Sequence, residues 1–180
     1  MALSSTMVLF DISLSDMDRG VYEDLELKVA RHPSESDVYM VARVLAYALE
    51  YSEGIAFSRG LAVADEPAVW VWDLTGRTEA WIEVGTPDAA RLHRASKAAD
   101  RVVVYCHKKL GPYMRALSGG RVHAAETVSI VELERSFVSS VAELLERRNR
   151  LALSVTEGQL YVDVGGESLD TTLNRHALPG

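Results

Sequence analysis

Three carboxylates, Asp65, Glu66 and Glu83, stand where a short β-hairpin would bring them together. The segment 68–84 contains two runs rich in β-branched and aromatic residues, separated by a turn. Antiparallel pairing about that turn places Glu83 opposite Ala68, with the other two acids just beyond the same end. Mg²⁺ prefers oxygen ligands and keeps several waters, so one to three carboxylates are enough to bind it. These residues therefore predict a divalent-metal site that could activate water and stabilise charge on a phosphate.

A set of basic residues, which we call the basic stripe, follows the hairpin. The segment 86–99 is predicted to be a helix that opens with Thr-Pro-Asp, the threonine as its cap and the proline as its first helical residue. Arg91, Arg94 and Lys97 recur every three residues along it and are candidate phosphate-binding groups. In the alternative interpretation, Arg91 simply pairs with Asp88 on the solvent face.

Glu35 is a further candidate acid, on another predicted helix. That helix is expected to begin with Ser34 as its cap, supported by Asp37 three residues on, and to end at Gly54. Its apolar residues recur at helical spacing: Val38, Val41, Ala42, Leu45, Ala46 and Leu49. Glu35 shares this sheet-facing side. It is either a ligand or active-site acid, or a first-turn acid favoured by the helix dipole.

The rest of the chain predicts one compact domain. Alternating and continuous apolar runs indicate strands near residues 6–14, 21–30, 56–61, 101–107, 127–133, 151–155 and 159–164. Two more helices are predicted at residues 108–117 and 134–147. This order favours an α/β (α+β) fold with a mixed β-sheet core and flanking helices. The last ~15 residues are polar and are expected to dock only loosely.

Composition limits the classes of function. The 180 residues include 19 Lys plus Arg against 26 Asp plus Glu, and the net charge of −7 argues against a strongly basic nucleic-acid coat, although a local basic groove remains compatible. No apolar run approaches the ~20 residues of a membrane span, and no membrane partner is expected. The single Cys106 reads as a small buried hydrophobe, and it fits a reducing, cytoplasmic setting. The five histidines lack the spacing of a zinc site.

Several strings resemble the YaeQ family of bacterial proteins when taken together. They are ARHPSES at 30–36, FSRGL at 57–61, DEP at 65–67 and WIEVGTPD at 81–88, with the closing hairpin. The resemblance covers nearly the whole chain and implies a variant of the PD-(D/E)XK, restriction-endonuclease-like fold. It implies a single domain over 1–180, with a nuclease-like core at about 34–133 and extra hairpins at about 6–30 and 150–165.

The resemblance also assigns roles to the candidate acids. Asp65 matches the first acid of the motif, Glu83 matches the acid of its E-x-K element, and Glu35 matches an acid carried by a helix in many such enzymes. The lysine of E-x-K should follow two residues after Glu83, where this chain has Gly85. The basic stripe could replace it, but arginine transfers protons poorly because it stays charged.

Three hypotheses follow. The first is a Mg²⁺- or Mn²⁺-dependent nuclease, or a nuclease-derived protein that binds nucleic acid through the basic stripe. The second is a catalytically inactive nuclease-fold protein with a regulatory, protein-binding role. The third is a purely structural acid cluster, with its charges paired to Arg31, Arg59 and Arg91.

Overall fold

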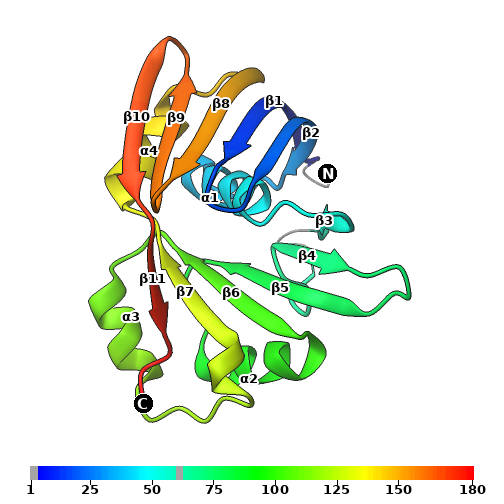
Figure 1. The fold of residues 1–180 in the computed structure, drawn as a ribbon, viewed down its shortest axis with the longest axis vertical. Helices are drawn as coiled ribbons and strands as arrows, with labels where there is room; N and C mark the ends of the chain where they lie inside the picture. The colour runs from blue at the N-terminus through cyan, green and yellow to red at the C-terminus, as the bar shows by residue number, and fades with distance from the viewer. Residues whose placement is uncertain (1–3, 60–62) are drawn as a thin grey trace.

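The computed structural model describes residues 4–59 and 63–180. These residues form an α+β architecture of two mixed sheets and four α-helices (Figure 1). The prediction of a mixed-sheet core with flanking helices is confirmed in part, because the structure has two mixed sheets. The segments expected as added hairpins at the two ends of the chain join each other instead, and they form a sheet of their own.

Sheet A contains the strands from the two ends of the chain, in the order β10-β9-β8-β1-β2. Its strands are β1 (Thr6–Asp16), β2 (Val21–Arg31), β8 (Arg148–Thr156), β9 (Gln159–Val164) and β10 (Glu167–Thr172). β1 pairs with β2 antiparallel and with β8 parallel. One face of β1 carries the buried side chains of Phe10, Ile12 and Leu14, because alternate residues of a strand share a face.

Sheet B contains the predicted acidic hairpin, in the order β11-β7-β6-β5-β4-β3. Its strands are β3 (Ile55–Phe57), β4 (Val69–Trp72), β5 (Thr78–Val84), β6 (Arg101–Cys106), β7 (Val128–Glu132) and β11 (Asn174–Ala177). Val69 lies opposite Ile82, so the predicted register with Ala68 opposite Glu83 is confirmed. β5, β6 and β7 are parallel, and their carboxyl ends therefore meet at one edge of the sheet.

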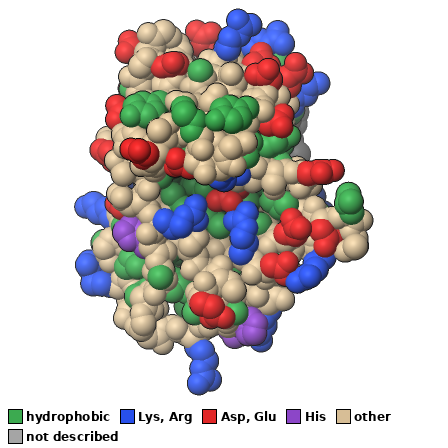
Figure 2. All heavy atoms as spheres, in the orientation of Figure 1, with side chains coloured by type: hydrophobic (Ala, Val, Ile, Leu, Met, Phe, Trp, Pro, Cys, Tyr) green, Lys and Arg blue, Asp and Glu red, His purple; other side chains and the backbone are tan. Residues whose placement is uncertain are grey.

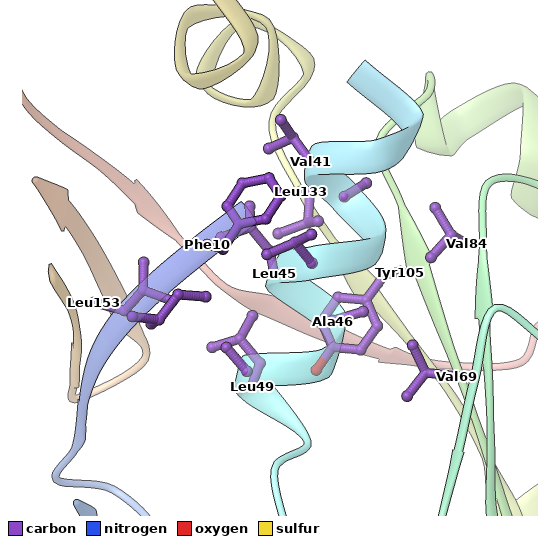
Figure 3. Packing of buried hydrophobic residues seen from close by; sticks show 14 of the residues in the cluster. Phe10, Val41, Leu45, Ala46, Leu49, Val69, Val84, Tyr105, Leu133 and Leu153 are labelled. Atoms are coloured by element: carbon purple, nitrogen blue, oxygen red, sulfur yellow. The ribbon is translucent and has the colours of Figure 1, made fainter. Parts of the chain in front are cut away.

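The helices are α1 (Asp37–Leu49), α2 (Ala89–Ala98), α3 (Leu110–Leu117) and α4 (Arg135–Glu143), with a 3₁₀ turn at Ala125–Thr127. Figure 3 shows α1 lying between the sheets. Leu45 and its neighbours meet Phe10 and Leu153 of sheet A on one side and Val69 and Tyr105 of sheet B on the other. One apolar core therefore joins the two sheets through α1. None of the described helices is long and apolar enough to cross a bilayer.

Both helices near the candidate acids begin later than predicted. The N-cap of α1 is Ser36, whose hydroxyl accepts a hydrogen bond from the Tyr39 amide at 3.1 Å. Glu35 therefore precedes the helix and does not lie in its first turn. The N-cap of α2 is Asp88, which accepts from the Arg91 amide at 2.8 Å, so Pro87 also lies before its helix. An Asp or Ser oxygen that reaches an amide three residues on fixes each start.

The carboxyl-terminal residues depart furthest from the prediction. They form β10 and β11, edge strands of the two sheets, and do not dock loosely. Polar side chains suit an edge strand because much of its surface faces water, so hydrophobic alternation does not reveal it. α4 ends at Glu143, because the chain then turns around the side chain of Asn149, which bonds both backbone groups of Glu146. Leu61, in the predicted third strand, lies outside the described residues.

Candidate functional site

Glu83 lies at the carboxyl end of β5 and is only 5% exposed. Its neighbours Ile82 and Val84 pack into the core around α1, whereas Trp81 on the alternate face packs toward α2. Glu83 points to this second side. Its Oε1 accepts hydrogen bonds from Trp81 Nε1 at 2.7 Å and from Arg91 Nε at 2.6 Å. The predicted acid is therefore buried and bound by two donors.

The Arg91 guanidinium is surrounded by oxygen atoms. Besides the Glu83 carboxylate, Nη2 donates to the Glu66 carbonyl at 2.7 Å and Nη1 donates to the Ala64 carbonyl. One carboxylate and two backbone carbonyls form a ligand set that a hard divalent cation would also accept. Here the chain's own cation occupies it. A Mg²⁺ ion does not fit these residues while Arg91 holds this position.

The other two hairpin acids do not converge with Glu83 through their carboxylates. The Glu66 carboxylate binds Arg59 at 2.6 Å and also accepts from the Arg59 amide, and these bonds lower the pKa of Glu66. Asp65 is exposed. Across residues 4–59 and 63–180, no three His, Cys, Asp or Glu side chains form a group that could hold a metal ion.

Glu35 forms a buried ion pair with Arg43 of α1. Its two oxygens accept from Arg43 Nη2 at 2.8 and 3.0 Å, and both side chains are 3% exposed or less. The same guanidinium donates to the Ala30 carbonyl at 3.2 Å and lies 5.3 Å from the Phe57 ring centroid. A buried carboxylate is tolerated only when its charge is compensated in this way. Glu35 therefore ties the loop before α1 to the helix.

A cavity of about 310 Å³ lies beside Arg91 and Glu83. Its walls also include Tyr39, Thr86 and Glu66. Burial raises the pKa of Tyr39, and the charges of both ion pairs, Glu35–Arg43 and Glu83–Arg91, act on its hydroxyl. Tyr39 thus stands between the two pairs. A larger hollow of about 740 Å³ lies elsewhere, over the outer face of β1, β2 and β8.

His107 follows β6 at the same sheet edge. It is 4% exposed, and its Nδ1 is buried without a hydrogen-bond partner among the described residues. Its ring meets that of Tyr39 edge to face, with the centroids 6.3 Å apart. Burial, together with the nearby charges of Lys108 and Arg135, lowers the pKa of His107 to about 4. This histidine is therefore neutral at physiological pH.

Gly85 stands two residues after Glu83, where a lysine was expected from the resemblance, but its backbone differs from that of a strand residue. β5 ends at Val84, and Gly85 has a φ of 102°, a conformation that side-chain-bearing residues rarely adopt. No heavy atom lies within 4 Å of the place where its Cβ would be. The backbone conformation, and not lack of space, therefore disfavours a lysine here.

The basic stripe is divided by the fold. Arg91 is bound to Glu83 and two carbonyls, whereas Arg94 and Lys97 are exposed on α2. The alternative interpretation paired the Arg91 side chain with Asp88. The Asp88 carboxylate instead accepts from the backbone amide of Arg91, and the guanidinium binds Glu83. Two exposed cations therefore remain available from the three predicted phosphate ligands.

Sequence reasoning identified the acids but missed two of the groups around them, Tyr39 and Arg43. Of the predicted arginine partners, Arg59 and Arg91 do bind acids of the candidate cluster. Arg31 instead binds Asp37, which lies outside that cluster. Arg43 was the available signal: it is a lone cation within the apolar run of α1, where an arginine requires a buried partner. Tyr39 carries no comparable signal, because its role depends on the position of sheet B relative to α1.

Comparison with known proteins gives a consistent result over the whole length. The family model for YaeQ protein matches residues 1–173. The uncharacterized protein YaeQ of Escherichia coli (strain K12) is 26% identical over 180 residues, which cover 99% of each chain. The protein of the same name from Salmonella typhi is equally similar, at 26% identity over 180 residues.

Two crystal structures have the same fold. The YaeQ protein from Pseudomonas syringae is 33% identical and superposes with a TM-score of 0.85, over 98% of this chain and 97% of that one. The YaeQ protein from Xanthomonas axonopodis pv. citri is 28% identical, with a TM-score of 0.87 over 98% and 100% of the two chains. The chain described here therefore belongs to the YaeQ family.

Proposed function

We propose that this protein is a catalytically inactive relative of metal-dependent nucleases and that it acts by binding a protein partner. The observation that carries the proposal is the Arg91 guanidinium, which takes its oxygen ligands from Glu83, Glu66 and Ala64. An arginine stays protonated at every accessible pH. It therefore neutralises the buried carboxylate but supplies neither an activated water nor a proton.

The order of the elements supports a nuclease-like origin. α1, the β4–β5 hairpin, α2 and β6 follow each other as expected for the restriction-endonuclease-like, PD-(D/E)XK variant. Glu83 stands at the end of β5, where that motif carries its acid. The lysine position holds Gly85 at a positive φ, so the backbone itself has departed from the catalytic pattern.

The charges favour a protein over a nucleic acid as partner. Nucleic-acid binding depends on several Lys or Arg contacts to phosphates. Here the net charge is −7, and only Arg94 and Lys97 of the basic stripe remain exposed. The cavity beside Arg91 is a suitable place for a partner's side chain, because its walls offer both a tyrosine and charged groups.

A second candidate is the metal-dependent nuclease. It is favoured by the same cavity, because withdrawal of Arg91 would leave a buried carboxylate beside an accessible space of about 310 Å³. The two candidates differ in whether the wild-type protein binds a divalent cation at Glu83.

Melting curves with and without Mn²⁺ test this difference. The wild type is expected to show no shift, and Arg91→Ala is expected to gain one, because the freed oxygens can then bind the ion. Mn²⁺ at about 100 times its dissociation constant would stabilise this variant by about 2.7 kcal/mol. The exposed Arg94→Ala on the same helix is the matched control and should behave like the wild type. Adding Glu83→Gln to Arg91→Ala should abolish the gain.

Cleavage and binding assays complete the test. Wild type, Glu83→Gln and Arg94→Ala are incubated with single- and double-stranded DNA and RNA in Mg²⁺ or Mn²⁺. Our proposal expects no cleavage and no saturable binding. A wild-type Mn²⁺ shift and a metal-dependent cleavage, both removed by Glu83→Gln, would establish the nuclease instead. Saturable binding without cleavage, weakened by Arg94→Ala, would make nucleic acid the partner.

A further inference from the structure

β2 is the last strand of sheet A, and among the described strands only β1 pairs with it. It is eleven residues long, which is long for an exposed edge. The outer row of an edge strand presents unpaired backbone groups, and such an edge readily pairs with another chain. On this edge the Ala30 carbonyl already accepts from Arg43 of α1. The part of the edge before Ala30 therefore needs either protection or a partner.

The side chains of β2 separate by face. Leu25, Leu27 and Val29 are buried against the core, whereas Glu26 and Lys28 on the alternate face are exposed. Figure 2 shows acidic and basic side chains close together at the upper right of the molecule, where Figure 1 places β2.

The charges of β2 also separate along its length. The acids Glu23, Asp24 and Glu26 occupy its first half, and the bases Lys28 and Arg31 occupy its second half. A strand with acids before bases is complementary to itself when two copies run antiparallel.

We propose that the β2 edges of two copies of this chain pair antiparallel about Leu27, forming a symmetric dimer with a continuous ten-stranded sheet. Facing residues must come from the same face of the sheet, so only every second register is allowed. The register about Leu27 sets Glu26 opposite the second copy's Lys28, twice by symmetry. It also sets Leu25 opposite Val29, so apolar residues meet apolar residues.

The neighbouring allowed registers are less favourable. Pairing about Glu26 would place two Glu26 side chains opposite each other, and pairing about Lys28 would do the same for two lysines. Like charges directly opposite are destabilising. In the proposed register the second copy's Glu23 also comes opposite Arg31, so an acid again faces a base. Charge therefore selects one register and one occupant, a second copy.

The test is the molar mass in solution, measured by light scattering and sedimentation on the full chain. The wild type should be a dimer. Glu26→Lys and Lys28→Glu each create two like-charge contacts and should raise the dimer dissociation constant about tenfold. Lys97→Glu, the same charge change on exposed α2, should leave it unchanged.

Two combinations make the test specific to this register. The double variant with both substitutions exchanges the charges and should dimerise like the wild type. A mixture of the two single variants should form a mixed dimer, because one chain then carries acids at both positions 26 and 28, and the other carries bases at both. A wild type that is monomeric at its highest soluble concentration would overturn the proposal. Equal dimerisation by all variants would also overturn it, because the interface would then lie elsewhere.

Discussion

At the scale of residues, the acids near the candidate site are held by arginines from different elements. Glu83 binds Arg91 of α2, Glu35 binds Arg43 of α1, and the Glu66 carboxylate binds Arg59. The Glu35–Arg43 pair is fully buried, and removal of one member of such a pair typically costs about 3–5 kcal/mol. These pairs favour the hypothesis of structurally neutralised acids.

His107 gives a pH prediction at this scale. Its pKa is lowered from 6.5 to about 4 in the folded protein, so the unfolded chain binds a proton that the folded chain rejects. The contribution of neutral His107 to the free energy of unfolding is therefore fully present above pH 6.5. It is lost as the pH falls toward 4, and the loss is about 3 kcal/mol for a shift of this size. Urea unfolding measured across this range should show a flatter pH dependence for His107→Gln than for the wild type.

The exposed His123 provides the control for this measurement. His123→Gln should keep the wild-type slope, because this side chain is exposed and lies away from the buried His107. Equal slopes for the wild type and His107→Gln would show that His107 is not the group responsible.

At the scale of elements, the start of α2 sets the position of Arg91. Asp88 accepts from the backbone amide of Arg91, and this bond fixes the first turn from which the guanidinium reaches Glu83. The parallel pair β5–β6 holds the other side, with the Gly85 amide bonded to the Tyr105 carbonyl at 2.9 Å. The N-cap at Asp88, the end of β5 and its parallel neighbour β6 together fix the position of the Arg91 side chain.

Asp88→Ala should therefore destabilise the protein by about 1 kcal/mol, because an orphan amide loses its acceptor. Thermal unfolding should show this as a fall in melting temperature of about 2–4 °C for a chain of this size. Thr86→Ala, two residues earlier and exposed, should change stability by less than about 0.5 kcal/mol. A larger effect of Thr86→Ala would mean that the threonine, and not the aspartate, caps α2.

At the scale of the whole molecule, α1 joins the two sheets into one core. Nine of its residues are buried, and they contact strands of both sheets (Figure 3). Unfolding of either sheet would expose this helix. We therefore expect the sheets to unfold together, as one cooperative unit.

Two optical probes can test this expectation. All three tryptophans lie in β4 and β5 of sheet B, so their fluorescence reports on that sheet, whereas far-ultraviolet circular dichroism reports on both. The two denaturation curves should coincide. The Leu45 side chain in α1 is 1% exposed. Leu45→Ala should lower the free energy of unfolding obtained from both curves by about 2–5 kcal/mol, because it leaves a cavity in the shared core. Leu74→Ala, at a turn position that is 97% exposed, should shift neither. Separate transitions would show that the sheets are independent.

The sequence alone determined the features that depend on neighbouring residues. The β1–β2 and β4–β5 hairpins, the register of Ala68 against Glu83 and the existence of the four helices follow from alternation, helical periodicity and turn residues. The acid at the end of β5 and the family resemblance were also readable from local strings.

Only the tertiary structure decided what those acids do. The pairing of β1 with β8, which are more than a hundred residues apart, creates the second sheet, and no local pattern encodes it. Likewise, the partners of Glu35 and Glu83 are arginines on two helices: α1, which packs between the two sheets, and α2, which packs against β5 and β6 of sheet B. Charge and spacing along the chain allow several pairings of acids with arginines. The packed structure leaves Glu35 and Glu83 each beside one guanidinium, because an unpaired buried charge would cost too much free energy.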